Sequence, residues 1–577
     1  MKSSYLWLAV AGILMSSCQS DEPVQEPAEE SRPPNIVLIL VDDMGYTDIG
    51  AFGSEVATPN LDALAFAGVR LTNFHSSPQC APTRSMLLSG SDNHKAGMGS
   101  MFGSRMIVGE YGDQEGYEQH LHPRVATLPE RLGDAGYHTY MAGKWHLGSG
   151  PDQAPGPADR GFDRSFALMS GSGSHFGYPT INPLAVYRED GERIDTLPGD
   201  FYSSITYTDK MIEYIGGNRG DDKPFFGYLA LTAPHWPLQA PAEYMDLYKG
   251  MYDEGYDVLR EHRIKRAEEL GVVPEVDPDL FNAVGQSWDE LTEDEQRYQA
   301  RKMELYAAMM HNMDDNVGRL VDYLKEIGEF DNTYFFFMSD NGAEADREDR
   351  NPTFAGQIER SGYVDNSYQN LGNPTSFVFL GPGFAQATAA PFRLFKGFPT
   401  EGGHKVTSFA YHPTLASGGI IDDQYLSIMD VMPTFLDVAG AEFDETTVRG
   451  REVVPMDGRS FAAALGDSDN PVYGPDDVIA HELHGQRYLL RGDWKILWEQ
   501  RPINIHWDDE YPDRWNTWQL FNLADDPTEQ HDLAAVEPEL TAELVALWEL
   551  WADDNNVIIS IKAQWPPPGP PARPARD

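Results

Sequence analysis

The chain has 577 residues, enough for more than one domain, and its 91 Asp and Glu residues against 43 Lys and Arg give a formal net charge of −48. Such an acidic surface repels nucleic acids and anionic lipid headgroups, so we expect no nucleic-acid partner and no charge-driven membrane binding. It also slows the long-range approach of a polyanionic substrate, unless a local basic pocket or high salt offsets the field.

The N-terminal segment, residues 1–18, reads "MKSSYLWLAVAGILMSSC" and has the features of an export signal. Lys2 is a short positive region, and the apolar stretch 5–15 is too short to span a bilayer as a mature helix. The end of the segment resembles a bacterial lipoprotein box, which predicts lipidation of Cys18. The alternative is an ordinary secretory signal cleaved nearby. Both predict an exported protein in the periplasm or at the outer membrane, and a lipid on Cys18 would be its only membrane link.

The second cysteine, Cys80, has no disulfide partner if Cys18 is lipidated, because the chain contains only these two. An unpaired cysteine in an exported protein requires a reason.

Buried strands alternate with helices over most of the chain. Residues 35–41, "NIVLILV", are a continuous apolar run that suits a strand buried on both faces of a parallel sheet. Similar runs occupy residues 137–141, 225–231, 333–338 and 376–380. Helical patterns lie between them at 58–68 and 306–330. In the second helix, one apolar face is formed by Met309, Met313, Val317, Leu320, Val321 and Leu324, and Gly328 marks the end. This alternation predicts an α/β fold with a large, mostly parallel sheet flanked by helices.

The domain organisation follows from changes in composition. Residues 19–33 are rich in Pro and Glu and are typical of a linker. The α/β domain is predicted over 34–470. Short strands with turns and a helix at 538–552 predict a smaller α+β subdomain over 471–560, and residues 561–577 form a Pro-rich tail.

Polar residues follow the predicted strands, where ligands of open α/β sheets bind. Asp42 and Asp43 end the first run, and Asp340 and Asn341 follow the run at 333–338. These four side chains offer only oxygen ligands, which suit Ca²⁺ or Mg²⁺ rather than zinc. The alternative for each acidic pair is a turn or a helix cap.

A second group of residues suits an anion. Pro82 lies where a helix over 83–88 would begin, and Cys80 and Arg84 lie beside that N-terminus, which presents free N–H groups. Further cationic or titratable residues near strand ends are Lys144, His146, His235 and Lys396. The alternative for each is a solvated surface residue or, for histidine, a hydrogen-bonded core residue.

Taken together, these stretches resemble the sulfatase family. "CAPTRSMLLSG" resembles the motif in which Cys-X-Pro-X-Arg directs oxidation of the cysteine to formylglycine, and "GYHTYMAGKWHLG" resembles the second sulfatase motif. "LVDDMG", "SDNGAE", "TAPHWP" and "FKGFPTEGG" look like further family elements, and "RGFDRSFALMSGSGSHF" and "YKGMYDEGYDVLREHR" look like the bacterial arylsulfatases. The resemblance spans residues 34–550 and implies an alkaline-phosphatase-like fold.

The resemblance implies hydrolysis of sulfate monoesters of the arylsulfatase type. A maturation enzyme would oxidise Cys80 to formylglycine, whose hydrate attacks sulfur with one hydroxyl to give a covalent sulfated enzyme. The second hydroxyl then allows sulfate to leave.

The resemblance also implies a role for each residue of the site. The metal would be Ca²⁺, with Mg²⁺ as the alternative, held by Asp42, Asp43, Asp340 and Asn341 and contacted by residue 80 as formylglycine. Arg84 would hold the hydrate, Lys144 and Lys396 would bind sulfate oxygens, His146 would act as the base and His235 as the acid.

One stretch departs from the family pattern, and other functions remain open. Where an apolar residue and an Arg commonly follow Glu-Gly-Gly, this chain has His404 and Lys405 after Glu401-Gly402-Gly403. Alternative functions are a carbohydrate sulfatase or a phosphonate or phosphate monoester hydrolase of the same superfamily. A non-enzymatic binding protein on a degenerate scaffold is disfavoured, because every expected position is filled.

Overall fold

The computed structural model describes most of the chain between Arg32 and residue 559. The described residues are 1, 32–101, 114–149, 153–178, 185–277, 284–347, 363–415, 418–467, 470–500 and 516–559. Cys18, nearly all of the predicted signal and linker, and the tail at 561–577 lie outside them. Among the described helices, none combines the length and apolar character that crossing a membrane requires.

A ten-stranded mixed sheet forms the centre of the larger domain, with the order β11-β2-β10-β9-β1-β8-β4-β5-β6-β7. Its parallel core consists of β9 (Thr333–Ser339), β1 (Asn35–Asp42), β8 (Phe225–Pro234), β4 (His138–Lys144) and β5 (Arg164–Leu168). The outer strands are β10 (Ser408–Tyr411), β2 (Val69–Leu71), β11 (Ile420–Asp422), β6 (Tyr187–Glu189) and β7 (Glu192–Ile194). The antiparallel pairs are β10 with β2 and β9, and β6 with β5 and β7, whereas β11 pairs in parallel with β2 at one edge of the sheet.

The sheet has an apolar core on each face, and β1 explains why. All eight of its residues are buried, and successive side chains point to opposite faces. Val37 and Ile39 belong to one apolar cluster, whereas Ile36 and Leu38 belong to the other. The predicted strands at 35–41, 137–141, 225–231 and 333–338 are confirmed as β1, β4, β8 and β9.

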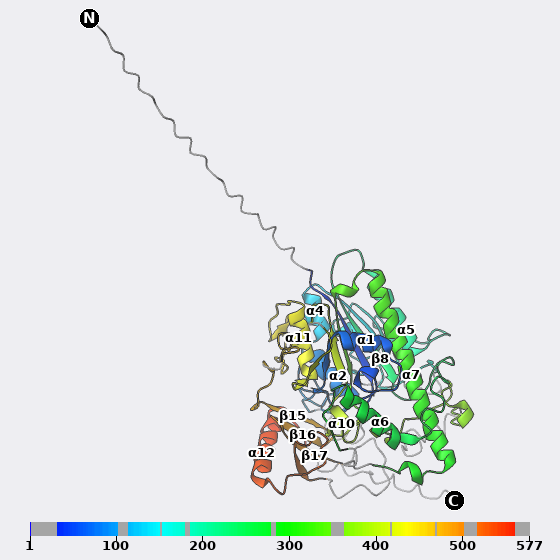
Figure 1. Cartoon of the computed structure of the whole chain (residues 1–577). Coiled ribbons are helices and arrows are strands. Elements are labelled where there is room, and N and C mark those ends of the chain that lie inside the picture. The colour runs from blue at the N-terminus through cyan, green and yellow to red at the C-terminus, as the bar shows by residue number, and fades with distance from the viewer. Residues whose placement is uncertain are drawn as a thin grey trace, which may run out of the picture.

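Helices cover both faces of the sheet (Figure 1). One core is built with α1 (Pro59–Ala67), α5 (Ser203–Gly217), α6 (Gly255–Glu269), α7 (Glu293–Glu326) and α9 (Pro382–Thr388). The other is built with α2 (Cys80–Ser89), α4 (Leu128–Asp134) and α11 (Val431–Val438). Shorter elements are α10 (Glu401–His404), β3 (Phe74–His75), β12 (Leu426–Ser427), β13 (Thr447–Val448) and β14 (Arg451–Glu452).

The long helix α7 begins well before the start at residue 306 that the apolar pattern predicts. A capping box sets its true start: the Thr292 hydroxyl accepts from the Glu295 amide at 3.4 Å, and the Glu295 carboxylate accepts from the Thr292 amide at 2.8 Å. The predicted apolar face is buried. Gly328 follows the helix with φ +75°, as expected for a terminating glycine.

The strand predicted at 376–380 is wrong, because these described residues form a buried irregular segment. Side-chain amides satisfy part of its backbone: Asn366 pairs with both backbone groups of Phe377 at 2.8 and 3.0 Å, and Gln239 donates to the Ser376 carbonyl at 2.9 Å. An apolar run indicates burial, and the sequence did not reveal that amide side chains would replace strand neighbours.

The C-terminal part forms a separate antiparallel sheet of β15 (Val478–Leu483), β16 (Gln486–Arg491), β17 (Trp494–Trp498) and β18 (Trp518–Asn522). Helix α12 (Pro538–Asp554) packs on it through Leu544 and Trp548, which join Leu489 and Ile496 in one apolar cluster. Short strands followed by a helix were predicted here, and the boundary at residue 470 stays a prediction.

Because the core is tightly packed, truncating a central aromatic side chain should greatly lower the free energy of unfolding. Phe337 of β9 is fully buried and stacks on Phe409 with ring centroids 5.0 Å apart. Phe337→Ala should lower the free energy of unfolding by about 3–5 kcal/mol, measured by denaturant titration with circular dichroism. The control Leu550→Ala, at a side chain that is 63% exposed, should change it by less than about 0.5 kcal/mol. Equal midpoints for the two variants would contradict this packing.

Candidate active site

The residues predicted to form a site meet at one edge of the central sheet. Asp42 ends β1, Lys144 ends β4, and His235 and Asp340 directly follow β8 and β9. Cys80 is the first residue of α2, which lies on one face of the sheet. Since β1, β4, β8 and β9 are parallel, their carboxyl ends bring these side chains together, as the sequence predicts.

Acidic and amide side chains form the centre of the site. Ligating atoms of Asp42, Asp43, Cys80 and His235 all lie within 4.8 Å of one another. The Asp43 amide donates to Asp340 Oδ1 at 3.2 Å, and Asn341 Nδ2 donates to Asp43 Oδ1 at 2.8 Å. All four predicted metal ligands are therefore in one buried group.

Two oxygens of this group fit a bound cation. Asp43 Oδ2 and Asn341 Oδ1 are buried and have no hydrogen-bond partner among the described residues. Buried acceptors are normally paired, because leaving them unpaired is costly. A hard divalent cation would satisfy both oxygens, so the donor set fits Ca²⁺ or Mg²⁺.

Three cationic side chains each pair with one of the aspartates. Lys144 Nζ lies 2.9 and 2.6 Å from the two Asp42 carboxylate oxygens, and Lys396 Nζ lies 2.6 Å from Asp43 Oδ1. Arg84 donates to Asp340 Oδ2 through Nε at 3.1 Å and Nη2 at 2.7 Å. These pairs fix the cations beside Cys80, where they would face an anionic substrate.

The carboxylates are nevertheless crowded. Burial raises the pKa of Asp42 well above its usual range, with Asp340 adding to the effect. Burial also raises the pKa of Asp43 to about 6, although Lys396 opposes it. For Asp340 burial is outweighed by Arg84, Lys144 and Lys396, so its pKa is lowered. A bound cation would therefore stabilise the ionised forms of these carboxylates.

Cys80 as encoded is a weakly nucleophilic thiol. Its side chain is buried, and burial raises its pKa to about 11 despite the opposing charges of Lys144 and Lys396. The thiolate is the nucleophilic form of cysteine, so at neutral pH this thiol is a weak nucleophile.

Burial disfavours the charged form of both predicted catalytic histidines. His235 Nδ1 donates to the Trp236 carbonyl at 2.7 Å, which leaves Nε2 facing Asp43 Oδ2 at 3.4 Å. His146 has φ +56°, a conformation that non-glycine residues seldom adopt, and its buried Nδ1 has no partner among the described residues. Burial and nearby cations, Lys144 and Lys396 among them, hold the pKa of both rings well below the usual range.

The structure adds two residues for which no role was predicted. Glu344 Oε2 lies 3.0 Å from Lys396 Nζ, and His175 Nε2 bonds to the His235 carbonyl at 2.9 Å. Both residues lie in stretches that resemble the family, "SDNGAE" and "SGSGSHF", so the sequence indicated the segments although not the contacts. Their contacts could not be predicted, because each joins segments that are distant in the sequence.

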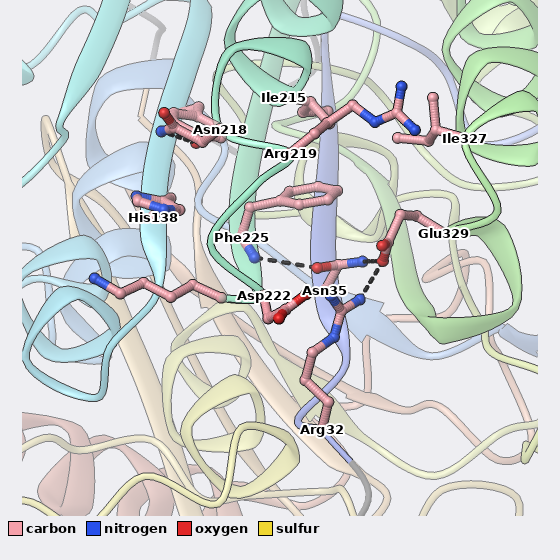
Figure 2. A pocket seen from close by; sticks show the side chains of 12 residues that line it. Arg32, Asn35, His138, Ile215, Asn218, Arg219, Asp222, Phe225, Ile327 and Glu329 are labelled. Atoms are coloured by element: carbon pink, nitrogen blue, oxygen red, sulfur yellow. Dashed lines mark hydrogen bonds and ion pairs between the residues drawn. The ribbon is translucent and has the colours of Figure 1, made fainter.

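A separate pocket lies at the opposite edge of the sheet (Figure 2). Asn35, His138 and Phe225, which begin β1, β4 and β8, line it together with Arg32 and Glu329. It contains none of the predicted site residues and lies at the amino ends of the strands, so it is distinct from the candidate active site.

Comparisons with known proteins agree with this arrangement. The sulfatase family profile matches residues 34–441. An uncharacterised sulfatase of Schizosaccharomyces pombe is 43% identical, covering 92% of this chain and 95% of the relative. The arylsulfatase of Klebsiella aerogenes is 40% identical over 76% of this chain and 93% of its own length.

Among solved structures, Ps i-CgsB in complex with k-i-k-neocarrahexaose superposes with a TM-score of 0.63. It is 24% identical, and the match covers 91% of this chain and 94% of that one, which supports the fold. The profile and the two relatives lead to one assignment: the chain belongs to the sulfatase family and is a sulfuric ester hydrolase.

Proposed function

We propose that this protein hydrolyses aryl sulfate esters after oxidation of Cys80 to formylglycine by a maturation enzyme. The observation that carries the proposal is one buried centre in which Cys80 lies with the aspartates, and in which Lys144 and Lys396 pair with those aspartates. The high pKa of the Cys80 thiol also favours a modified side chain, because the encoded one is a weak nucleophile.

Two groups would complete the site. Asp42, Asp43, Asp340 and Asn341 would hold Ca²⁺, which when bound neutralises sulfate oxygens and makes the attacking hydroxyl more acidic. Formylglycine would supply an aldehyde hydrate, with one hydroxyl to attack sulfur and a second that allows sulfate to leave.

The chain's own side chains would do the remaining work. Lys144 and Lys396 would bind the sulfate oxygens and stabilise the charge that develops there, and Arg84 would orient residue 80. His146, neutral with a free Nδ1 in the described structure, is suited to act as a base.

His235 would protonate the leaving oxygen, but burial and the nearby Lys144 and Lys396 hold its pKa well below the usual range. A proton on Nε2 requires nearby negative charge, and the sulfate group of the substrate would supply it. We therefore expect His235 to become an acid only when substrate is bound.

An aromatic wall beside His235 favours an aryl leaving group. The half-buried Trp236 ring lies 4.5 Å from the His235 ring, and it packs on Phe379 at 4.8 Å and Phe377 at 5.6 Å. Phe377 and Phe379 are buried, so the Trp236 ring would supply the flat apolar surface on which a phenol could stack. A carbohydrate sulfatase is the second candidate, since Ps i-CgsB, of similar fold, was solved with an oligosaccharide.

The first prediction concerns substrate class and Cys80. Matured protein should have a higher kcat/KM for 4-nitrophenyl sulfate than for sugar sulfates or an aryl phosphonate monoester. The peptide over 76–84 should show the mass loss of an aldehyde. Cys80→Ala should keep the circular dichroism spectrum and lose all turnover, because only the nucleophile is removed. Full activity in this variant would overturn the mechanism, and a preference for sugar sulfates would favour the second candidate.

The second prediction concerns the metal. Adding Ca²⁺ to chelator-treated protein should raise its melting temperature, because the cation binds only the folded site. Asn341→Ala removes one unpaired oxygen and should weaken this shift at least about tenfold in Ca²⁺ concentration, measured by differential scanning fluorimetry. The control Asp477→Asn alters a surface pair with Arg459 and should respond like the wild type. Restoration by Zn²⁺ but not Ca²⁺ would mean that the ligand set is wrong.

The third prediction tests the roles of the histidine and the lysines. An alkyl sulfate leaves as a basic alkoxide and needs a proton, whereas nitrophenolate needs it far less. General acid catalysis contributes about 10²–10⁴-fold, so His235→Ala should retain much more nitrophenyl than alkyl activity in steady-state assays. Lys144→Ala and Lys396→Ala should slow both substrates equally. An equal loss for His235→Ala would instead assign it to sulfate binding.

A further inference from the structure

A fully buried charged cluster joins the C-terminal sheet to the loop over 393–404, which carries Lys396. We call it the Glu401 cluster, and it consists of His75, Glu401, His404, Lys495 and Glu529. Lys495 Nζ lies 2.7 Å from Glu401 Oε1, 2.7 Å from Glu529 Oε1 and 3.0 Å from His404 Nε2. His75 Nε2 bonds to Glu401 Oε2 at 3.0 Å. The side chains are at most 1% exposed.

The cluster already contains its cation. Atoms of His75, Glu401 and His404 lie close enough to hold a metal ion, but the Lys495 ammonium contacts both Glu401 and His404. The Lys495 ammonium therefore contacts two of the three residues that a metal would bind. His404 stands where an apolar residue is common in the family, and its contact with Lys495 gives that departure a structural role.

Glu401 connects to the predicted sulfate-binding lysine through its own loop. The Gly402 amide donates to the Arg393 carbonyl at 3.0 Å, and the Lys396 amide donates to the Ala343 carbonyl at 3.2 Å. The backbones are in close contact: a Cβ on Gly342 would lie 2.0 Å from the Gly402 carbonyl oxygen. A displacement of Glu401 would therefore be transmitted to Lys396 and to the loop that carries Asn341.

Glu401 connects equally to the segment that leads into Cys80. His75 belongs to β3, five residues before Cys80. The Ser76 amide donates to the His404 carbonyl, and the Gly397 amide donates to the Pro78 carbonyl, both at 2.8 Å. The loop over 393–404 is thus bonded to the segment over 75–78 on the approach to the nucleophile.

The other side of the cluster belongs to the C-terminal sheet. Lys495 lies on β17, and Glu529 follows β18 and accepts a hydrogen bond from the Glu401 amide at 3.0 Å. Glu499, just after β17, pairs with Arg393 at 2.7 Å. The start and the end of the 393–404 loop are therefore both held by charges of this sheet.

We infer that Lys495 is a positioning residue for catalysis: through Glu401 it fixes both Lys396 and the segment that carries Cys80. The C-terminal sheet would then complete the active site without touching substrate. The kinetic part of this inference rests on the proposed function, and the geometric part does not.

The test compares Lys495→Met with two other variants. Removing the lysine leaves buried carboxylates unpaired and lowers stability, so a control must lower stability without touching the cluster. Leu544→Ala serves, because Leu544 is fully buried between α12 and the C-terminal sheet. Lys495→Arg keeps the charge. If Lys495→Met does not fold, the double variant Lys495→Met/Glu529→Gln, which removes one of the unpaired charges, replaces it.

The first readout is independent of turnover. In unmatured protein with Cys18→Ser, Cys80 is the only cysteine, and its alkylation by iodoacetamide reports how firmly its segment is held. Below the melting temperature, Lys495→Met should be labelled at least about tenfold faster than the wild type. Leu544→Ala, at a matched loss of stability, should be labelled at the wild-type rate. Equal labelling of the wild type and Lys495→Met would overturn the inference, as would equal acceleration in both variants.

The second readout uses matured protein and 4-nitrophenyl sulfate, with rates normalised to aldehyde content. Lys495→Met should lower kcat/KM by about 10–10²-fold with a raised KM, because the sulfate-binding lysine is misplaced. Lys495→Arg should restore most of the loss, and Leu544→Ala should leave KM unchanged. Unchanged KM and kcat in Lys495→Met would overturn the positioning role while the proposed function stands. A wild type inactive on aryl sulfates would overturn the proposed function, and the labelling result would still decide the inference.

Discussion

The site depends on a balance of buried charge. Three aspartates whose ionisation is disfavoured by burial are each paired with a cation from a different part of the chain: Asp42 with Lys144, Asp43 with Lys396, and Asp340 with Arg84. Removing any partner would leave an unpaired charge in the interior, which typically costs 3–5 kcal/mol. The pairing therefore fixes the relative positions of β1, β4, β9, α2 and the 393–404 loop. In the proposed function, the same cations would face an anionic ester without rearrangement.

The position of these charged residues at strand ends explains why the site could be located from the sequence. In a parallel sheet, the residues that follow the strands lie at the same edge. Predicted buried strands precede Asp42, Lys144, His235 and Asp340. The sequence pattern thus located the site at the carboxyl edge of the sheet, whereas α2 begins at Cys80, two residues before the start predicted at Pro82. The family resemblance assigned individual roles, which the geometry accommodates.

Other features could not be predicted, because they depend on partners far away in the chain. Glu344 and His175 lie in stretches that the sequence analysis identified. Their contacts with Lys396 and His235 arise only in the folded protein. The segment 376–380 looks like a strand because its burial is real, yet Asn366 and Gln239 supply its hydrogen bonds. Lys495 lies 94 residues from Glu401, in a different sheet, and no local pattern links the two.

The burial of Cys80 has a consequence for the order of events in biogenesis. Its side chain is 4% exposed at the start of α2, beneath the cations and carboxylates of the site. An enzyme that oxidises this thiol must enclose it in its own active site, and the folded protein offers no room for that. The modification would therefore have to precede closure of the sheet edge, while residues around 80 are still an extended peptide. Folding of the chain would then compete with the proposed maturation in time, and the fraction of active molecules would be set kinetically before the native state forms.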